Sequence, residues 1–129
     1  MSDKISVEII TPDKLILKAD ASEVTIPSYE GLMGILKDHI PLITFLRPGL
    51  ISIKNQDEKK YYVEEGTVEF SNNNLLILTT KAKNLKDLDK TSIENLLKAS
   101  EQELKRNDIS DKERYLASYK VDTLKEINQ

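Results

Sequence analysis

The chain has 129 residues, of which 32% are charged and 39% are hydrophobic, and its formal net charge is −3. This size and apolar content suit one ordinary domain or two small ones, so a disordered or fibrous chain is not expected. The balanced charge disfavours a nucleic-acid-binding surface. With no cysteine and one histidine, the chain lacks the residues for disulfides and thiolate metal sites.

The N-terminus and the longest apolar runs bear on targeting. Residues 1–6 lack an apolar signal-peptide core and an Arg-rich transit pattern, so we expect the mature chain to begin here. The longest apolar runs, such as Leu75–Leu78, are far shorter than the roughly 20 residues that cross a bilayer. We therefore expect any link to a membrane to come through a partner.

The front part of the chain has the pattern of short strands. Apolar and polar residues alternate at Ile5–Ile9, Val24–Ile26 and Ile51–Ile53, which is the period of half-buried strands. Turn-forming clusters such as Thr11–Asp13 and Asn72–Asn74 separate these segments. The spacing predicts an antiparallel β-sandwich or barrel of about ten strands.

The composition changes near Leu85–Asp89. All four glycines and all four prolines precede residue 67, and β-branched residues become rarer after residue 86. Strands giving way to helices would produce this change. The prediction is an α+β fold with a β-sandwich over residues 1–86 and a helical hairpin over residues 87–129.

The helical period begins after Asp89. One stripe comprises Ile93, Leu96, Leu97, Ser100 and Leu104. Thr91–Glu94 has the pattern of a capping box, and Asn107 can end this helix in a left-handed conformation.

A second helix is predicted directly afterwards. Ser110–Glu113 has the pattern of another capping box, and the following stripe comprises Leu116, Tyr119, Thr123, Leu124 and Ile127. The two helices form an antiparallel hairpin whose narrow apolar seam is marginal in isolation. We expect it to dock on the sandwich or on another protein, and two docking surfaces would permit a conformational switch.

Few residues suggest chemistry. The sequence has neither a P-loop nor a G-x-G-x-x-G pattern, and His39 alone cannot anchor a typical transition-metal site. We predict no catalytic residue, no metal site and no cofactor. A hydrolase using Asp38 and His39 would require His39→Ala to abolish turnover, and a loop histidine at the surface is the favoured interpretation.

Three carboxylates lie close together in the sequence. Glu64, Glu65 and Glu69 could suggest a cation site, but strand alternation puts Glu65 and Glu69 on one face and Glu64 on the other. The pattern therefore favours a solvated strand edge.

The segment Tyr29–Leu36 is unusually apolar for a turn region. It carries Gly31 and Gly34 among large apolar side chains. This composition indicates a contact surface, whereas the alternative is that Leu32, Met33 and Leu36 fold inward. Periodicity alone leaves both interpretations open.

At this segment the chain resembles the epsilon subunit of bacterial F-type ATP synthases, which corresponds to the mitochondrial delta subunit. The resemblance is carried by Val24–Thr44, by Leu46–Ile53 and by Tyr62–Phe70, where Glu65 replaces the first of two glycines common in the family. It is strong over residues 5–80 and weaker beyond. The order of a strand-rich part and a helical hairpin also matches, so the resemblance extends over essentially the whole chain.

The resemblance implies a non-catalytic rotor subunit of the central stalk, which couples proton flow to ATP synthesis. It implies a gamma-subunit contact at His39, Ile40, Pro41 and Leu42. It also implies a c-ring contact at Tyr29, Glu30, Gly31, Leu32, Met33 and Gly34, with transient contact between the hairpin and the alpha and beta subunits. The implied location is peripheral, at the cytoplasmic face of the bacterial inner membrane.

The family's hairpin is described as a brake on ATP hydrolysis, with a nucleotide-sensing pattern [IL]DxxRA at its start. Leu88 and Asp89 match this pattern, but Ser92 and Ile93 replace the Arg and Ala. The nucleotide contact would then fall to Asp89 without a guanidinium to bind phosphate, so ATP binding is not expected.

The charges of the second helix bear on the brake. Its lysines and arginine are balanced by Asp111, Glu113, Asp122 and Glu126, whereas strong inhibitors in the family tend to be basic. We expect weak or absent inhibition. The alternative function is a free-standing β-sandwich that binds a ligand or peptide and has a helical lid.

Overall fold

The structure is a computed structural model that describes residues 3–128. The chain forms two compact units that divide between Leu85 and Lys86. The front unit contains the strands β1 (Ile5–Ile10), β2 (Leu15–Ala21), β3 (Glu23–Ser28), β4 (Gly31–Leu36), β5 (Leu42–Leu46), β6 (Gly49–Lys54), β7 (Glu58–Val63), β8 (Gly66–Ser71), β9 (Asn74–Thr79) and β10 (Ala82–Asn84). A short 3₁₀ turn, Leu85–Asp87, spans the division, and the second unit contains the helices α1 (Lys90–Lys105) and α2 (Asp111–Ile127).

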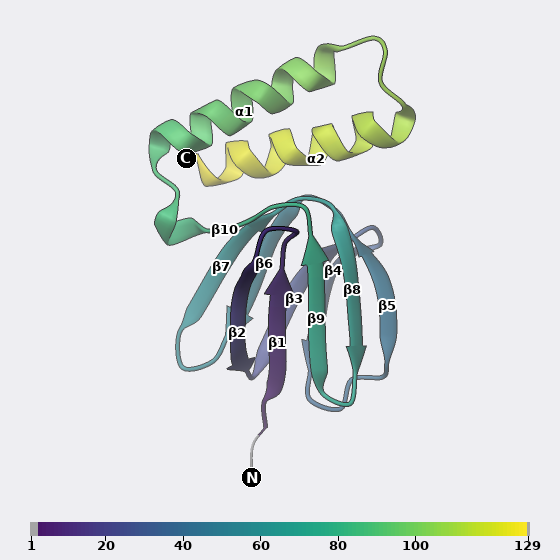
Figure 1. The fold of residues 1–129 in the computed structure, drawn as a ribbon, viewed down its shortest axis with the longest axis vertical. Helices are drawn as coiled ribbons and strands as arrows, with labels where there is room; N and C mark the ends of the chain where they lie inside the picture. Colours follow the sequence, from purple (N-terminus) through teal and green to yellow (C-terminus); the bar gives the residue numbers. More distant parts are fainter. Residues whose placement is uncertain (1–2, 129) are drawn as a thin grey trace. The chain divides into compact units, whose positions relative to one another are not determined.

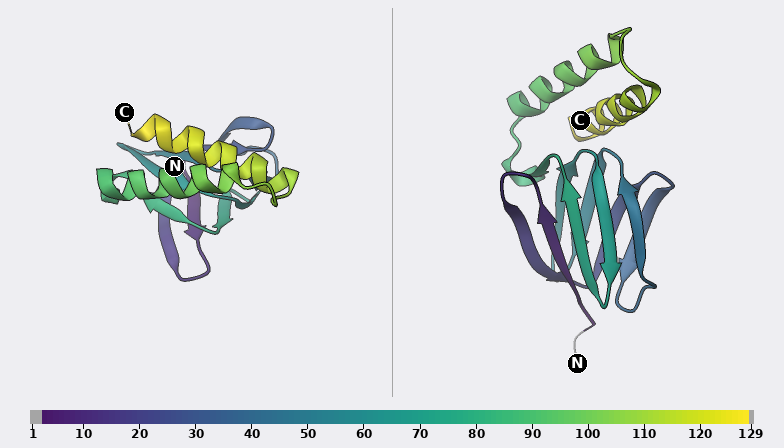
Figure 2. Two further views of the ribbon diagram at one scale, coloured as in Figure 1. Left: turned by 90° about the horizontal axis from the view of Figure 1, so that it is seen from above. Right: turned by 45° about the vertical axis from the view of Figure 1, so that its right-hand side comes forward.

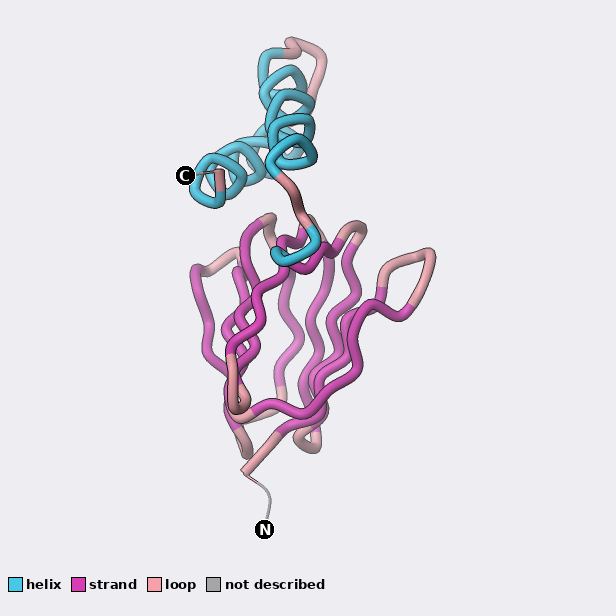
Figure 3. The backbone as a smooth tube through the Cα atoms, turned by 90° about the vertical axis from the view of Figure 1, so that its left-hand side faces the viewer, coloured by secondary structure: helices cyan, strands magenta, loops and turns pink. Residues whose placement is uncertain are grey.

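The strands form two layers (Figures 1 and 3). One layer has the order β2-β1-β9-β8-β5 and the other β10-β7-β6-β3-β4. The layers join because β3 pairs with β6 along its first half and with β5 at its end, through Ser28 and Leu46. All pairs are antiparallel except β1 with β9, which is parallel.

Alternate residues of both layers point inward and form one core. On β1 the buried residues are Ile5, Val7 and Ile9, with the polar or half-buried residues between them. The same alternation in the other strands buries a larger set that includes Val24, Ile26, Ile35, Leu46, Ile51, Val68, Phe70, Leu75 and Ile77. The predicted α+β fold, a sandwich of ten strands followed by two helices, is confirmed (Figure 2).

A close approach between strands requires glycine at the start of β8. A Cβ atom at Gly66 would overlap the carbonyl oxygen of Leu78 and would lie 2.8 Å from the Cα atom of Thr79. Both are backbone atoms of β9, which cannot rotate away as a side chain can. Gly66 therefore sets how closely β8 and β9 pack.

The helix ends differ from the sequence prediction in two places. The N-cap of α1 is Asp89, whose Oδ1 accepts a hydrogen bond from the Ser92 amide at 2.7 Å, so the predicted capping box beginning at Thr91 is wrong. Helix α1 ends at Lys105 with an extended residue, Arg106, as its cap, so the predicted left-handed Asn107 is also wrong. The guanidinium of Arg106 instead donates to both carboxylate oxygens of Asp108, at 3.0 and 2.8 Å.

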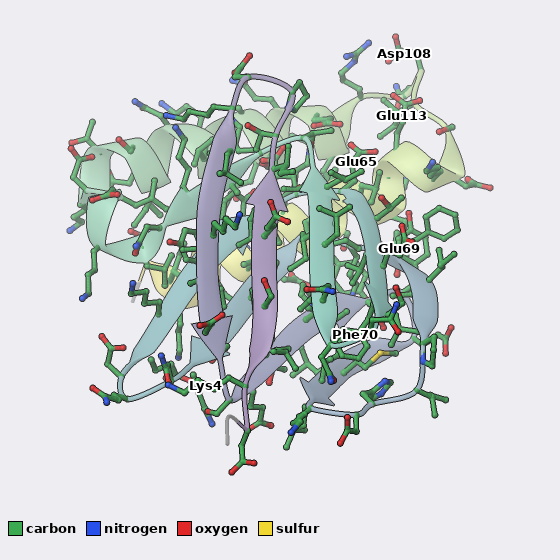
Figure 4. The ribbon with its side chains drawn as sticks, turned by 60° about the horizontal axis from the view of Figure 1, so that its bottom comes forward. Lys4, Glu65, Glu69, Phe70, Asp108 and Glu113 are labelled. Carbon is green, nitrogen blue, oxygen red and sulfur yellow. The ribbon has the colours of Figure 1, made fainter. Side chains whose placement is uncertain are left out.

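The start of α2 follows the prediction. The Ser110 hydroxyl accepts from the Glu113 amide, and the Glu113 carboxylate accepts from the Ser110 amide, both at 3.1 Å. Asp108 and Glu113 mark this connection in Figure 4. Arg114 donates to the carbonyl oxygens of Leu104 and Arg106 and so ties the two helices together at this end.

The helices bury fewer large side chains than the sandwich does. In α1 the buried residues are Ile93 and Ser100. In α2 they are Leu116, Ala117, Val121, Thr123 and Leu124, whereas the predicted stripe residues Tyr119 and Ile127 are only half-buried. The ring of Tyr119 contacts that of Tyr115 edge to face, with 4.9 Å between centroids.

Candidate functional site

The β3–β4 connection is a tight turn that displays two side chains. Ser28 pairs with Gly31, so Tyr29 and Glu30 alone form the loop. The Ser28 hydroxyl donates to the Gly31 carbonyl oxygen at 2.7 Å and accepts from the Glu30 amide at 3.3 Å. Gly31 has φ +118°, which side-chain-bearing residues rarely adopt. Gly31 and Ser28 thus fix a turn whose Tyr29 and Glu30 are exposed.

Strand β4 shows which of Leu32, Met33 and Leu36 fold inward, a point on which the sequence left two interpretations open. Leu32 is 71% exposed and Leu36 is 50% exposed, so both point outward. Ile35 is fully buried, and Met33 is half-buried and packs against the core. The segment is therefore a strand with one apolar face inside and another apolar face in solvent.

The β4–β5 loop carries the only histidine. The His39 amide donates to the Leu36 carbonyl oxygen at 3.1 Å, and His39 Nδ1 lies 2.7 Å from the Ile40 carbonyl oxygen. The imidazole meets the ring of Phe70 edge-on, with 6.0 Å between centroids. His39 is therefore a half-buried loop histidine with a hydrogen-bonding distance to its neighbour, whereas Ile40 is 74% exposed.

The outer face of β5 connects the turn and the loop. Ile43 is 81% exposed and Phe45 is 62% exposed, and they lie on the same side of the strand because they are two residues apart. At one end Phe45 contacts the ring of Tyr29, at 5.9 Å between centroids, and at the other β5 follows directly after the loop that holds Ile40. We call Tyr29, Ile40, Ile43 and Phe45 the β5 surface.

The sequence motifs do not identify Ile43 and Phe45 as surface residues. In the sequence they alternate with Leu42, Thr44 and Leu46, but the alternation alone does not say which of the two sets faces the core. Leu46 is fully buried and Leu42 packs partly against the core, which assigns the even-numbered residues to the inside. The register then forces Ile43 and Phe45 outward.

A row of paired residues crosses the same layer from β5 to β2. Phe45 lies opposite Thr67, Thr67 opposite Leu78, and Leu78 opposite Ile10, which in turn lies opposite Leu15. Leu78 is 43% exposed and Leu15 is 50% exposed. Thr67 and the half-buried Ile10 interrupt this row, so the β5 surface ends at Phe45 and Leu15 lies outside it.

The residues predicted to contact two different partners lie at opposite ends of one strand. The Tyr29–Gly34 segment begins before β4, and the His39–Leu42 segment follows after its end. The six residues of β4 separate the Tyr29–Glu30 turn from the loop that holds His39 and Ile40 by roughly 20 Å. The β5 surface joins the turn and the loop on one side, because Phe45 contacts Tyr29 and Ile43 follows soon after Ile40.

The acidic residues do not converge on a cation site. Glu64 accepts a hydrogen bond from the Tyr62 hydroxyl at 2.8 Å, while Glu69 is exposed and lies opposite Ile43 and Leu76 in the sheet. Glu65 precedes β8, and Figure 4 shows it and Glu69 at separate points along that strand's course.

Asp38 and His39 do not form an acid–base pair. Asp38 Oδ1 accepts a hydrogen bond from the side chain of Asn73 at 3.3 Å, whereas His39 Nδ1 faces the Ile40 carbonyl oxygen. The hydrolase interpretation therefore has no geometry to support it.

The carboxylate of Asp89 already has a structural role. Hydrogen bonds from the backbone amide of Ser92, and secondarily from its side chain, lower the pKa of Asp89. The carboxylate therefore stays ionised at neutral pH as the α1 cap.

No described helix is long and apolar enough to span a bilayer.

Similarity to known proteins assigns the chain to a family. Residues 4–85 match the family model described as the ATP synthase delta/epsilon chain, β-sandwich domain. The chain belongs to this family. It is 49% identical over 130 residues to the ATP synthase epsilon chain of Pelagibacter ubique, covering 99% of this chain and 100% of that protein. It is 30% identical over 129 residues to that of Parvibaculum lavamentivorans, covering 98% and 97%.

Solved structures share the fold. A chain in the cryo-EM structure of the Euglena gracilis mitochondrial ATP synthase, OSCP/F1/c-ring, matches with a TM-score of 0.74 at 19% identity, covering 97% of this chain and 79% of that chain. A chain of the Tetrahymena thermophila mitochondrial ATP synthase central stalk and c-ring matches with a TM-score of 0.67 at 20% identity, covering 99% and 98%. The predicted resemblance is confirmed, and this family member is a non-catalytic subunit of the rotary complex. The alternative of a free-standing ligand-binding module has no support from these matches.

Proposed function

We propose that this rotor subunit of the ATP synthase binds the gamma subunit through the β4–β5 loop and the outer face of β5. The predicted contact residues are His39, Ile40, Pro41 and Leu42, and we add Ile43 and Phe45 because they are exposed on the adjoining strand. The observation that carries the proposal is the exposure of Ile40, Ile43 and Phe45, at 74%, 81% and 62%. When a partner covers three large exposed apolar side chains, the removal of their surface from water stabilises the complex.

The c-ring contact is proposed for the other end of β4, at Tyr29, Glu30, Gly31, Leu32, Met33 and Gly34. Tyr29, Glu30 and Leu32 are its exposed large side chains, whereas Met33 packs partly against the core. The rigid turn between Ser28 and Gly31 presents a polar and an aromatic group together. This combination suits the polar loops of a ring of membrane subunits.

The proposed contacts explain how a chain without catalytic residues takes part in coupling. A subunit held by both gamma and the c-ring turns with them and transmits torque between ion flow and the distant catalytic sites. The chain would lie peripherally at the cytoplasmic face of the bacterial inner membrane, and its hairpin would meet the alpha and beta subunits transiently.

Binding measurements with single charged substitutions test the two contacts separately. Ile43→Asp should weaken binding to purified gamma at least tenfold, because the partner would have to bury an unpaired carboxylate. Glu30→Lys should leave gamma binding intact and weaken association with the c-ring. Leu15→Asp is the matched control, since Leu15 is 50% exposed on the same layer but at its far edge, on β2.

The result that would overturn the gamma contact is equal affinity for Ile43→Asp and the parent chain. An equal loss for Ile43→Asp and Leu15→Asp would also count against it, because the effect would then not be local to β5.

The hairpin is proposed to be at most a weak brake on ATP hydrolysis, because the charges of α2 balance. Removal of residues 88–129 should leave hydrolysis by the assembled enzyme within about twofold of the full-length complex. A manyfold increase in ATPase rate on truncation would show that the brake does not depend on basic charge.

A further inference from the structure

A hydrogen-bonded connection joins two loops that are far apart in the sequence. The Asp38 amide donates to Asn73 Oδ1 at 2.7 Å, and Asn73 Nδ2 donates to Asp38 Oδ1 at 3.3 Å. Asp38 lies in the β4–β5 loop and Asn73 in the β8–β9 turn. One asparagine side chain therefore uses both its acceptor and its donor on the same residue of the other loop.

The backbone at both ends of this connection is unusual and fixed. Asp38 has φ +67°, and Asn72 and Asn73 have φ +50° and +60°. Positive φ at both central residues is the geometry of a tight two-residue hairpin turn, in which asparagine is favoured. The Asn73 carbonyl oxygen also accepts from the Ser6 amide at 2.9 Å, so the turn is anchored to β1. Asn73 thus offers a rigid support to a loop that is otherwise exposed.

The supported loop is the one that presents Ile40. Its other restraints are the bond from the His39 amide to the Leu36 carbonyl oxygen and the contact of the imidazole with Phe70, a residue of β8. Asp38, held by Asn73, lies two residues before Ile40 and immediately before His39. Restraint of a binding loop before association lowers the ordering entropy that binding would cost.

We infer that Asn73 is a positioning residue for gamma binding: its side chain holds Asp38 and so keeps the β4–β5 loop in the conformation that presents Ile40. The inference rests on the proposed gamma contact, to which Asn73 itself does not belong. Asn73 acts indirectly, through its two hydrogen bonds to Asp38.

The test compares Asn73→Gly with Asn72→Gly. Both positions have positive φ, which glycine adopts readily, so both variants should keep the turn and show similar stability. Only Asn73→Gly removes the side chain that reaches Asp38. Asp38→Asn is a conservative variant, because an asparagine keeps an acceptor oxygen and tolerates positive φ.

Two measurements are made on the full-length chain. Amide exchange over residues 37–40 in the free chain should rise about tenfold in Asn73→Gly, and affinity for purified gamma should fall roughly five- to tenfold, as expected for the loss of a hydrogen-bonded restraint. Asn72→Gly and Asp38→Asn should match the parent chain in both. A thermal unfolding midpoint shared by the two glycine variants separates positioning from stability.

Other outcomes would overturn the inference. Unchanged exchange over residues 37–40 in Asn73→Gly would show that the connection does not restrain the loop, and equal affinity losses in both glycine variants would assign the effect to the turn backbone. Ile40→Asp distinguishes the two proposals. If Ile40→Asp abolishes gamma binding while Asn73→Gly binds fully, the positioning role alone fails, whereas full binding by Ile40→Asp removes the gamma contact itself.

Discussion

The sandwich and the helical hairpin are stabilised in different ways. In the sandwich, a strand such as β1 pairs with β2 and with β9, so each buried residue has neighbours from distant parts of the chain. In the hairpin, α1 buries Ile93 and Ser100, and specific bonds cluster at the helix ends. Substitutions in the sandwich should therefore act through packing over a wide area, and those in the hairpin through local capping.

The largest effect is expected at Gly66. Gly66→Ala would place a methyl group against the Leu78 carbonyl oxygen, so β8 and β9 would have to separate. The cost should reach about 3 kcal/mol or more, as in overpacked cores, and lower the unfolding midpoint by more than roughly 10 °C. Differential scanning calorimetry measures this.

Gly34→Ala is the control for this substitution, because a Cβ there would meet only Glu23 Oε2 at 3.5 Å, an ordinary contact. It should change the midpoint by little. Similar midpoints for the two variants would mean that β8 and β9 can relax apart and that the sandwich is less tightly constrained than its packing indicates.

A smaller effect is expected at Ser110 in the hairpin. Ser110→Ala removes the hydroxyl that accepts from the Glu113 amide and should destabilise α2 by about 1 kcal/mol. Amide exchange in the first turn of α2 should accelerate while exchange in β1 and β9 stays unchanged. Ser110→Asp, which also caps helices, should restore protection, and faster exchange across the sandwich would contradict the local nature of this element.

The smallest effect concerns pH. The pKa of Asp89 is lowered by the Ser92 amide, so the ionised cap favours the folded helix. Its contribution is fully present above the unfolded-state pKa of about 3.9 and is lost as the pH falls through the lower folded-state value. The Ser92 amide chemical shift should therefore titrate below about pH 3.9. Asp89→Asn keeps a cap without this titration, and an identical titration in the variant would exclude Asp89 as its source.

Local patterns in the sequence predicted the elements better than their ends. The alternation at Ile5–Ile9 and the capping box at Ser110 follow from neighbouring residues alone, and both predictions are confirmed. The start of α1 was misassigned because Asp89 and Thr91 are both good caps, and only the bond from the Ser92 amide decides between them. The predicted left-handed end at Asn107 is wrong because α1 ends with an extended residue, Arg106, whose guanidinium pairs with Asp108.

The site was only partly predictable, because it depends on pairing between distant strands. The turn and the loop could be located from their sequence motifs. The outward direction of Ile43 and Phe45 on the β5 surface could not, since it depends on the pairing of β5 with β8 and on which face of β5 meets the core. The bond between Asp38 and Asn73 is of the same kind, because neither neighbourhood in the sequence points to the other.

The parallel pair of β1 and β9 determines when the sheet can be completed. Ser6 lies opposite Asn74, so one edge of β1 has no partner until β9, far along the chain, has been synthesised. Closing so long a loop has an entropic cost that precedes any gain from pairing, and pairings of this kind slow folding. Until β9 is complete, the backbone N–H and C=O groups along this edge of β1 stay available for pairing with other strands.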